Sequence, residues 1–353
     1  MNVLSRVYGR ATELRRAWYG RRPHRVRRLD RPVVSVGNVL VGGSGKTPLV
    51  AAIVRLLAAA GERPAILSRG YGRREPADGV VVVSDGRQVL ATPGQAGDEP
   101  YMLARTLPGV PVFVSPDRYL AGRLAEWRFG CTVHVLDDGF QHVQLARDVD
   151  LVVMSRADLD ERLLPLGRLR EPLAAARAAH ALLVAGGDED VQAVAAAVGV
   201  KTTFRVARRY GAPRPIASSG AVRAGVSAAA SAEAGRRVVA VAGIARPERF
   251  FAALRELGWD VARECVFRDH HWFTPREVAT IDRAAADTGA DLVMTTEKDS
   301  VRLPEDVDVG RAPTARHEAP AWAYLPLEVV VEPADRFASW LQERLSAARR
   351  EAA

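Results

Sequence analysis

A glycine-rich stretch near the start of the chain has the residue types that bind nucleotide phosphates. It reads VGNVLVGGSGKTPLV and spans residues 36–50. Glycines let backbone N–H groups turn inward around phosphate oxygens, a lysine lies against the β- and γ-phosphates, and a threonine hydroxyl binds Mg²⁺. The standard loop pattern also has an earlier glycine, and Leu40 stands at that position. The candidate nucleotide-binding residues are Gly42, Gly43, Ser44, Gly45, Lys46 and Thr47.

Two adjacent acids end an apolar run further along the chain. In VLDDGFQH, residues 135–142, an apolar strand leads into Asp137 and Asp138. This order is typical of a Walker-B strand, whose carboxylate supports Mg²⁺. Because side chains alternate along a strand, the two acids need not share a role, and which of them touches the metal stays open. The structural alternative is an acidic turn after a strand.

Three further motifs contain candidate functional groups. In GDEP, residues 97–100, Asp98 is either a general base for an acceptor hydroxyl or an acid that caps a helix. In FRDHHWF, residues 267–273, a histidine either tunes a carboxylate across an interdomain cleft or belongs to a surface loop. In LLPLGRLREP, residues 163–172, Arg168 and Arg170 are candidates for phosphate binding, and Glu171 either binds metal or caps a helix.

The elements that must position these residues alternate between strands and helices. Residues 31–36 read as a buried strand, 47–61 as a helix with Pro48 near its start, and 63–72 as a second strand with a glycine-rich turn. This strand–loop–helix–strand order is the context that a phosphate-binding loop requires. The alternation continues to about residue 206 and predicts a doubly wound parallel sheet.

The length of the chain favours a second domain. A chain of 353 residues is longer than one core usually serves. Residues 207–235 are rich in Ala, Gly, Ser and Pro, which indicates an interdomain connection. We therefore expect an α/β protein with two α/β/α domains: a P-loop NTPase-type domain over residues 31–206 and a smaller α/β domain over residues 236–353.

The positive charge of the chain is concentrated at its N-terminus. The formal net charge is +8, and residues 1–31 alone contain ten arginines and two acids. Apolar residues recur at helical spacing between Val3 and Trp18, which predicts a basic amphipathic helix within residues 1–30. Such a helix suits an anionic membrane surface, whereas the alternative is a helix packed on its own domain. We expect no membrane-spanning segment, because no apolar run reaches about 18 residues.

Taken in order, these motifs resemble those of the tetraacyldisaccharide 4′-kinases, the lipid A 4′-kinases of Gram-negative bacteria. The resemblance runs from about Met1 to Arg302. The matching segments are GNVLVGGSGKTP, SRGYG, AGDEP, LDDGFQH, LARDVDLVV, LLPLGRLREP, AGIARPERFF, DHH and TTEKD. The resemblance implies that ATP and Mg²⁺ serve transfer of a phosphoryl group to the 4′-hydroxyl of a tetraacyldisaccharide 1-phosphate, giving lipid IVA. It also implies a peripheral, monotopic location on the cytoplasmic face of the inner membrane.

The resemblance also assigns roles to individual residues. Asp98 matches the catalytic carboxylate, and His270 resembles its partner. Thr47, Asp137, Asp138 and Glu171 match metal-side positions. Contacts with the lipid headgroup are implied for Tyr71, Arg118, Gln141 and Arg170.

The sequence leaves three alternatives to this function: a P-loop ATPase switch, a soluble small-molecule kinase and a non-enzymatic membrane adaptor. The intact Lys46–Thr47 pair and the two acids argue against the adaptor. A membrane-associated P-loop ATPase switch also combines such a loop with an amphipathic helix, and it would hydrolyse ATP without a lipid acceptor. A nucleic-acid partner is not expected, because the positive charge lies on one terminal segment rather than across a folded domain. No obligate protein partner is evident from the sequence.

Overall fold

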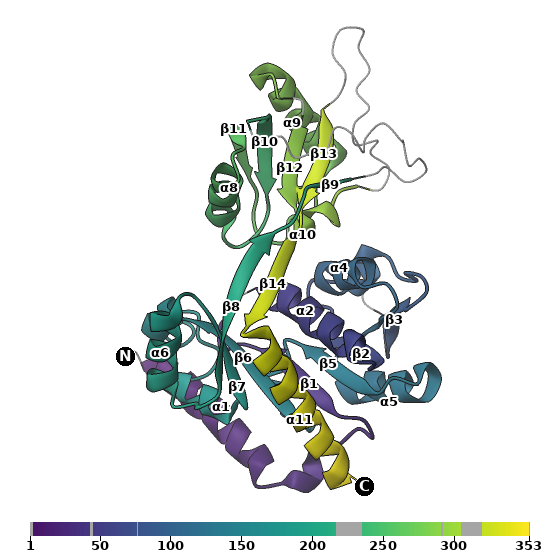
Figure 1. Cartoon of the computed structure of the whole chain (residues 1–353), viewed down its shortest axis with the longest axis vertical. Helices are drawn as coiled ribbons and strands as arrows, with labels where there is room; N and C mark the ends of the chain where they lie inside the picture. Colours follow the sequence, from purple (N-terminus) through teal and green to yellow (C-terminus); the bar gives the residue numbers. More distant parts are fainter. Residues whose placement is uncertain are drawn as a thin grey trace. The chain divides into compact units, whose positions relative to one another are not determined.

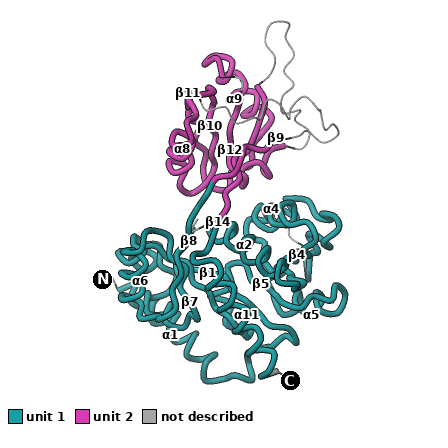
Figure 2. Tube along the Cα trace, in the orientation of Figure 1, with its two compact units in different colours: residues 1–209, 329–353 teal, residues 210–328 magenta. Residues whose placement is uncertain are grey.

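The chain divides into two units, shown in Figure 2. The computed structural model describes residues 3–42, 45–75, 77–216, 235–290, 292–304 and 320–352. Unit 1 comprises Met1–Arg209 and Val329–Ala353, and unit 2 comprises Tyr210–Glu328. Unit 2 is thus inserted into the sequence of unit 1, and the C-terminal segment belongs to unit 1 rather than to the second domain in which we expected it. Of the expected connection at 207–235, residues 217–234 lie outside the described residues.

Unit 1 contains a nine-stranded sheet. The pairs among its central strands are parallel, and the strand at one end is antiparallel to its neighbour. This arrangement confirms the predicted doubly wound sheet. Across the sheet the order is β14 (Leu327–Glu332), β8 (Thr203–Tyr210), β7 (Ala181–Ala185), β6 (Val149–Ser155), β1 (Val33–Gly37), β5 (Val133–Asp137), β2 (Pro64–Ser68), β4 (Pro111–Val114) and β3 (Val81–Asp85).

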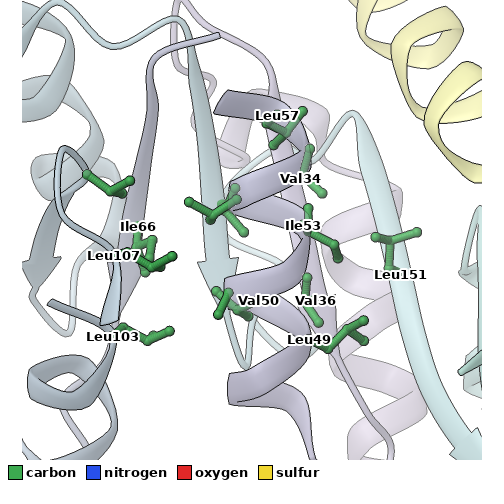
Figure 3. Packing of buried hydrophobic residues seen from close by; sticks show 14 of the residues in the cluster. Val34, Val36, Leu49, Val50, Ile53, Leu57, Ile66, Leu103, Leu107 and Leu151 are labelled. Carbon is green, nitrogen blue, oxygen red and sulfur yellow. The ribbon is translucent and has the colours of Figure 1, made fainter. Parts of the chain in front are cut away.

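Helices cover both faces of this sheet, which explains why its strands read as nearly continuous apolar runs. Along β1, Val34 and Val36 pack with one set of helices while Val33 packs with another. Figure 3 shows the first face, where α2 (Lys46–Ala59) places Leu49, Ile53 and Leu57 against the strands. Unit 1 also contains the helical segments α3 (Pro93–Ala96), α4 (Asp98–Thr106), α5 (Arg118–Phe129), η2 (Arg156–Asp160), η3 (Leu173–Ala178) and α6 (Asp188–Val198).

The C-terminal helix α11 (Ala334–Ala352) completes this core (Figure 1). Phe337, Leu341 and Leu345 recur every four residues, so they share one face of the helix. All three are almost fully buried in the same cluster as the residues of α2. The ring of Phe337 also meets that of Phe204 edge to face, with centroids 5.0 Å apart. These contacts explain why the last segment belongs to unit 1.

Unit 2 is the smaller α/β domain. Its sheet has the order β11 (Asp260–Val266), β10 (Arg237–Ala242), β12 (Leu292–Thr296), β13 (Ala321–Leu325) and β9 (Arg214–Pro215). The first four strands are parallel and β9 is antiparallel to β13. Helix α8 (Pro247–Glu256) covers one face and α9 (Pro275–Thr288) the other, and a short α10 (Glu297–Ser300) follows β12. This confirms the prediction of a second α/β/α domain.

The N-terminal helix α1 (Val3–Gly20) turns its apolar stripe outward. Val3, Leu4, Val7, Leu14 and Trp18 are between 41% and 69% exposed, whereas the small residues Ser5 and Gly9 are buried. A short turn, η1 (Pro23–Arg25), then leads toward β1. In the described part of the chain, no helix combines the length and hydropathy needed to cross a bilayer.

Candidate active site

The glycine-rich loop joins the end of β1 to the start of α2, as predicted. Gly42 and Gly45 have φ values of 96° and 79°, a conformation that favours glycine and turns the backbone sharply. Gly43 and Ser44, which we also expected to bind nucleotide, lie outside the described residues. A guanidinium nitrogen of Arg208 is 3.2 Å from the position that a Cβ at Gly45 would occupy. The loop is therefore bordered by a positive charge.

Leu40, which replaces the early glycine of the standard pattern, is buried and pairs with another segment. It forms an antiparallel bridge with Leu169, and the N–H of Val41 donates to the carbonyl of Arg168 at 2.8 Å. The Arg168 side chain in turn donates to the Val41 carbonyl, with Nη2 at 3.0 Å. The first part of the loop is thus extended rather than curled, so an early glycine is not needed and the turn begins at Gly42.

Lys46 is the first residue of α2 and lies between an amide and an acid. Its Nζ donates to Oδ1 of Asn38 at 3.0 Å and lies 3.3 Å from Oδ1 of Asp138. Thr47, which follows it, is buried. The Nε2 of Gln141 donates to the Asn38 carbonyl at 2.8 Å. The phosphate-binding loop and the acidic motif are therefore joined at one edge of the sheet.

The acidic pair lies at the carboxyl end of β5, where β1 and β2 also end. Asp137 is the partner of Val36 across the sheet, and the hydroxyl of Ser68, at the end of β2, donates to Asp137 Oδ2 at 3.4 Å. Burial, together with the nearby carboxylates of Glu99 and Asp138, raises the pKa of Asp137 to about 7. Asp137 is thus deeply buried beside two other carboxylates, and a bound cation would offset the repulsion between these negative charges.

Asp138 has a different environment although it is the next residue. It has a φ of 53°, which is unusual outside glycine, and its Oδ2 accepts from Arg170 Nη1 at 2.7 Å. Burial alone would raise the pKa of Asp138, but the Lys46 ammonium and the Arg170 guanidinium hold it below its ordinary value. The two acids therefore differ in charge state and partners, as strand alternation suggested.

These residues fit a Mg²⁺ ion. Oδ1 of Asp137 is buried without a hydrogen-bond partner, and Oδ1 of Asp138 is buried with the Lys46 ammonium 3.3 Å away. Mg²⁺ prefers such oxygen ligands and is usually held by one or two carboxylates together with substrate phosphates and water. Among the residues that the structure describes, no group of three or more His, Cys, Asp or Glu side chains forms a metal cage. Asp137, Asp138 and the Thr47 hydroxyl are thus the side chains available for an ion that is shared with a nucleotide.

Glu171, the other expected metal-side acid, is engaged in an ion pair. Its Oε2 lies 2.6 Å from Nη2 of Arg16, which belongs to α1. The carboxylate is nearly buried and the guanidinium is half-buried. The metal role of Glu171 remains a prediction, and the structure adds the N-terminal helix as its partner.

Asp98 begins α4 and lies beside the SRGYG turn. It is 4% exposed, and its Oδ1 accepts from the N–H of Glu99 at 2.9 Å. Gly97 precedes it with a φ of 86°, and a Cβ there would come 2.8 Å from the carbonyl oxygen of Tyr71. The Tyr71 side chain itself is exposed. Two motifs that are distant in sequence, SRGYG and AGDEP, are therefore in contact.

Arg118 and Gln141 lie near the acidic pair. Arg118 starts α5 and is buried, and Nη1 donates to the Pro116 carbonyl at 3.3 Å. Burial and the positive charge of Arg69 lower the pKa of Arg118 to about 10, so it stays charged at neutral pH. Arg170 Nη1 lies 3.5 Å from Oε1 of Gln141. Of the four expected headgroup residues, Arg170 binds Asp138, Gln141 contacts Arg170, and Arg118 interacts electrostatically with both acids.

His270 lies in unit 2. It has a φ of 62°, and its Nε2 lies 3.2 Å from Nζ of Lys298. Asp269 Oδ1 lies 3.7 Å from the same Nζ. Asp98 belongs to unit 1, so the expected partnership of Asp98 and His270 remains a prediction.

Sequence reasoning missed four residues at this site: Asn38, Arg16, Arg208 and Glu99. Asn38 is fully buried. It is a polar residue directly after an apolar strand, and that position in the sequence could have identified it. Glu99 adjoins Asp98 in a motif that we had selected. Arg16 and Arg208 are distant in sequence from the residues that they approach, so no local pattern indicates them.

Comparisons with known proteins indicate the family of this chain. A family model described as tetraacyldisaccharide-1-P 4′-kinase matches residues 1–346. The tetraacyldisaccharide 4′-kinase of Geobacter metallireducens is 43% identical over 311 residues, which cover 85% of this chain and 87% of the relative. That of Syntrophus aciditrophicus is 38% identical over 350 residues, which cover 96% and 90%.

A solved structure is similar along nearly the whole chain. The crystal structure of LpxK from Aquifex aeolicus in complex with ATP has a TM-score of 0.74 and 32% sequence identity, and the match covers 97% of each chain. The similarity therefore includes both units and is not limited to the phosphate-binding loop. On this evidence the chain belongs to the tetraacyldisaccharide-1-P 4′-kinase family.

Proposed function

We propose that this chain transfers the γ-phosphoryl group of ATP to the 4′-hydroxyl of a tetraacyldisaccharide 1-phosphate. The bond between the γ-phosphorus and ADP breaks, and the products are ADP and lipid IVA, in lipid A biosynthesis. Family membership along most of the chain supports the proposal. The structural observation that carries it is the 3.3 Å contact between Lys46 and Asp138, which joins the phosphate-binding loop to the Walker-B acids. Phosphoryl transfer depends on that combination.

The nucleotide side of the site works by positioning and charge neutralisation. Backbone N–H groups of loop 42–47 bind the phosphates, and the compact Lys46 ammonium lies between them. Thr47, together with Asp137 or Asp138, would hold Mg²⁺. When bound, Mg²⁺ neutralises charge on the β- and γ-phosphates.

On the acceptor side, Asp98 is the proposed general base. It accepts the proton of the 4′-hydroxyl as that oxygen attacks the γ-phosphorus, and His270 is its proposed partner. Headgroup contacts are assigned to Tyr71, whose ring is exposed, and to Gln141 and Arg170 beside Asp138. Arg118 is also assigned to the headgroup, although its buried guanidinium requires a deep approach of the substrate.

The N-terminal helix is the proposed contact with the membrane, on the cytoplasmic face of the bacterial inner membrane. A helix that merely packs on its own domain would bury its apolar stripe, whereas Leu4, Val7 and Leu14 are exposed on α1. Arginines such as Arg6 and Arg21 flank that stripe and suit anionic lipid headgroups. The lipid acceptor is itself held in a bilayer, so a peripheral surface contact brings the enzyme to its substrate.

An acceptor assay tests the proposed function. Purified protein is incubated with Mg²⁺, radiolabelled ATP and tetraacyldisaccharide 1-phosphate in mixed micelles, and the lipid is separated by thin-layer chromatography. We expect a labelled lipid that is absent without the acceptor. Rapid ATP hydrolysis with no labelled lipid would instead favour the ATPase switch.

A further inference from the structure

The inward face of α1 contacts a segment that carries functional residues. The Ser5 hydroxyl donates to the Leu163 carbonyl at 3.2 Å. A Cβ at Gly9 would come 2.9 Å from the Leu163 side chain and 3.7 Å from Pro172. Small residues on this face therefore allow the helix to approach residues 163–172, the segment that contains Arg170 and Glu171.

Arg16 makes the strongest of these contacts. Its Nη2 is 2.6 Å from Oε2 of Glu171 and 3.4 Å from the carbonyl oxygen of Phe140, to which it donates. Its guanidinium also stacks 4.4 Å from the centroid of the Phe140 ring. A planar guanidinium can stack and donate in this way, whereas a lysine ammonium cannot reproduce both interactions.

Two neighbouring contacts hold the loop that follows the acidic pair. Arg15 Nη1 donates to the Gln141 carbonyl at 3.1 Å, and Gln144 Nε2 donates to the Tyr19 hydroxyl at 3.1 Å. The helix therefore contacts residues 140–144 as well as residues 163–172. Both segments carry side chains that we assign to the acceptor or the metal.

These contacts continue toward the phosphate-binding loop. Arg170, next to Glu171 in the chain, binds Asp138, and Asp138 contacts Lys46. A continuous series of interactions thus runs from α1 through Glu171 and Arg170 to the nucleotide site. Removal of Arg16 would leave the carboxylate of Glu171 nearly buried without this cation, and such groups move or become hydrated.

We propose that Arg16 is a positioning residue of the active site, which fixes Glu171 and the Phe140–Gln141 backbone. The inference rests on the proposed function of these residues. Under this proposal α1 has two roles: its outer face contacts lipid, and its inner face holds active-site residues in position. Turnover then depends on Arg16 even when binding to a membrane is not limiting.

The test compares Arg16→Ala with a matched variant, Arg28→Ala. Arg28 also belongs to the basic N-terminal segment and also forms one ion pair, 2.7 Å from Asp148. Each variant therefore loses one positive charge and one ion pair, but only Arg16 contacts the proposed site residues. Turnover is measured in mixed micelles at saturating ATP and acceptor, and thermal unfolding checks that both variants are folded. Arg16→Lys retains the charge and serves in place of Arg16→Ala if that variant does not fold.

We expect Arg16→Ala to lower kcat by about tenfold or more, because a misplacement of about 1 Å can cost about 100-fold. The KM for ATP should change little, and Arg16→Lys should be intermediate. Arg28→Ala should keep wild-type kcat. Equal kcat values for the Arg16→Ala and Arg28→Ala variants would overturn the inference.

Hydrogen exchange gives a readout that does not depend on activity. In the protein without ligands, amides of residues 140–144 and 163–171 should exchange faster in Arg16→Ala than in the wild type or in Arg28→Ala. Unchanged exchange there would contradict a positioning role. If the wild type failed to phosphorylate the acceptor, the proposed function would be refuted, and the exchange comparison would still decide whether Arg16 orders these segments.

Discussion

Lys298 donates a hydrogen bond to His270, with Nζ 3.2 Å from Nε2. The same ammonium lies 3.7 Å from a carboxylate oxygen of Asp269. An ammonium group has donors and no acceptor, so Nε2 of His270 must accept and the proton of the neutral ring lies on Nδ1. Lys298 therefore selects which ring nitrogen of His270 can donate to a carboxylate.

The tautomer of His270 can be measured directly. In protein labelled with ¹⁵N-histidine, we expect the neutral ring of His270 to carry its proton on Nδ1. Lys298→Met removes the donor, so the Nε2–H form should gain population. The variant His270→Gln identifies the signals. An Nε2–H form in the wild type would contradict this assignment.

Replacement of Asp98 should separate catalysis from helix capping. We expect Asp98→Asn to lower turnover by about 10²- to 10⁴-fold, the range for loss of a general base, with little change in ATP affinity. The matched control is Thr92→Ala, which removes the cap of the preceding short helix, where the Thr92 hydroxyl accepts from the Gln95 N–H. The control should cost about 1 kcal/mol of stability and leave turnover unchanged. Near-normal turnover in Asp98→Asn would reduce Asp98 to a structural role.

A single substitution on the outer face of α1 should weaken membrane binding. Leu14 is exposed, so Leu14→Ser should change stability by less than about 0.5 kcal/mol. If Leu14 inserts into lipid, its loss costs about 1.5–3 kcal/mol of binding, which is measurable by flotation with anionic liposomes. Trp127 on α5 is an exposed aromatic control. Loss of flotation in Trp127→Ser but not in Leu14→Ser would show that α5, rather than α1, contacts the membrane.

Asp137 should destabilise the protein without ligands at neutral pH. Its folded pKa is raised to about 7 from an ordinary 3.8, so between these values the folded state binds more protons than the unfolded state. The contribution of this group to stability therefore falls as pH rises from about 4 to about 7. In EDTA and without nucleotide, Asp137→Asn should raise the free energy of unfolding at pH 8, and the gain should shrink toward pH 4.

The same substitution should abolish kinase activity, because it removes a candidate metal ligand. Asp282→Asn is a control for buried acids outside the site, since burial also raises the pKa of Asp282. It should retain activity. A gain in stability for Asp137→Asn that is independent of pH would contradict the raised pKa.

Local patterns predicted the phosphate-binding loop and the two α/β domains well. A glycine-rich loop between a buried strand and a helix has few alternatives, and continuous apolar strands separated by helices require a parallel sheet covered on both faces. The position of Leu40 shows where this reasoning ends. The role of Leu40 depends on pairing with Leu169, which is far away in the sequence. From the motif alone, Leu40 is therefore only a departure from the phosphate-binding pattern.

Two other features depend on long-range contacts for the same reason. An apolar stripe on α1 is visible in the sequence, but the pattern does not say whether the stripe faces the protein or the solvent. The ion pair of Arg16 with Glu171 joins residues 155 positions apart, and no local rule indicates it. The last strand and helix likewise follow unit 2 in sequence, although Phe337 and Leu341 pack in the core of unit 1.

The return of α11 to unit 1 has a consequence for biosynthesis of the protein. The N-terminus emerges from the ribosome first, and N-terminal domains usually fold before C-terminal ones. Here the first unit to emerge lacks part of its core until Val329–Ala353 has been made, after all of unit 2. The nucleotide-binding unit is therefore begun first and completed last, and a nascent chain that stops short of α11 leaves part of this apolar core uncovered.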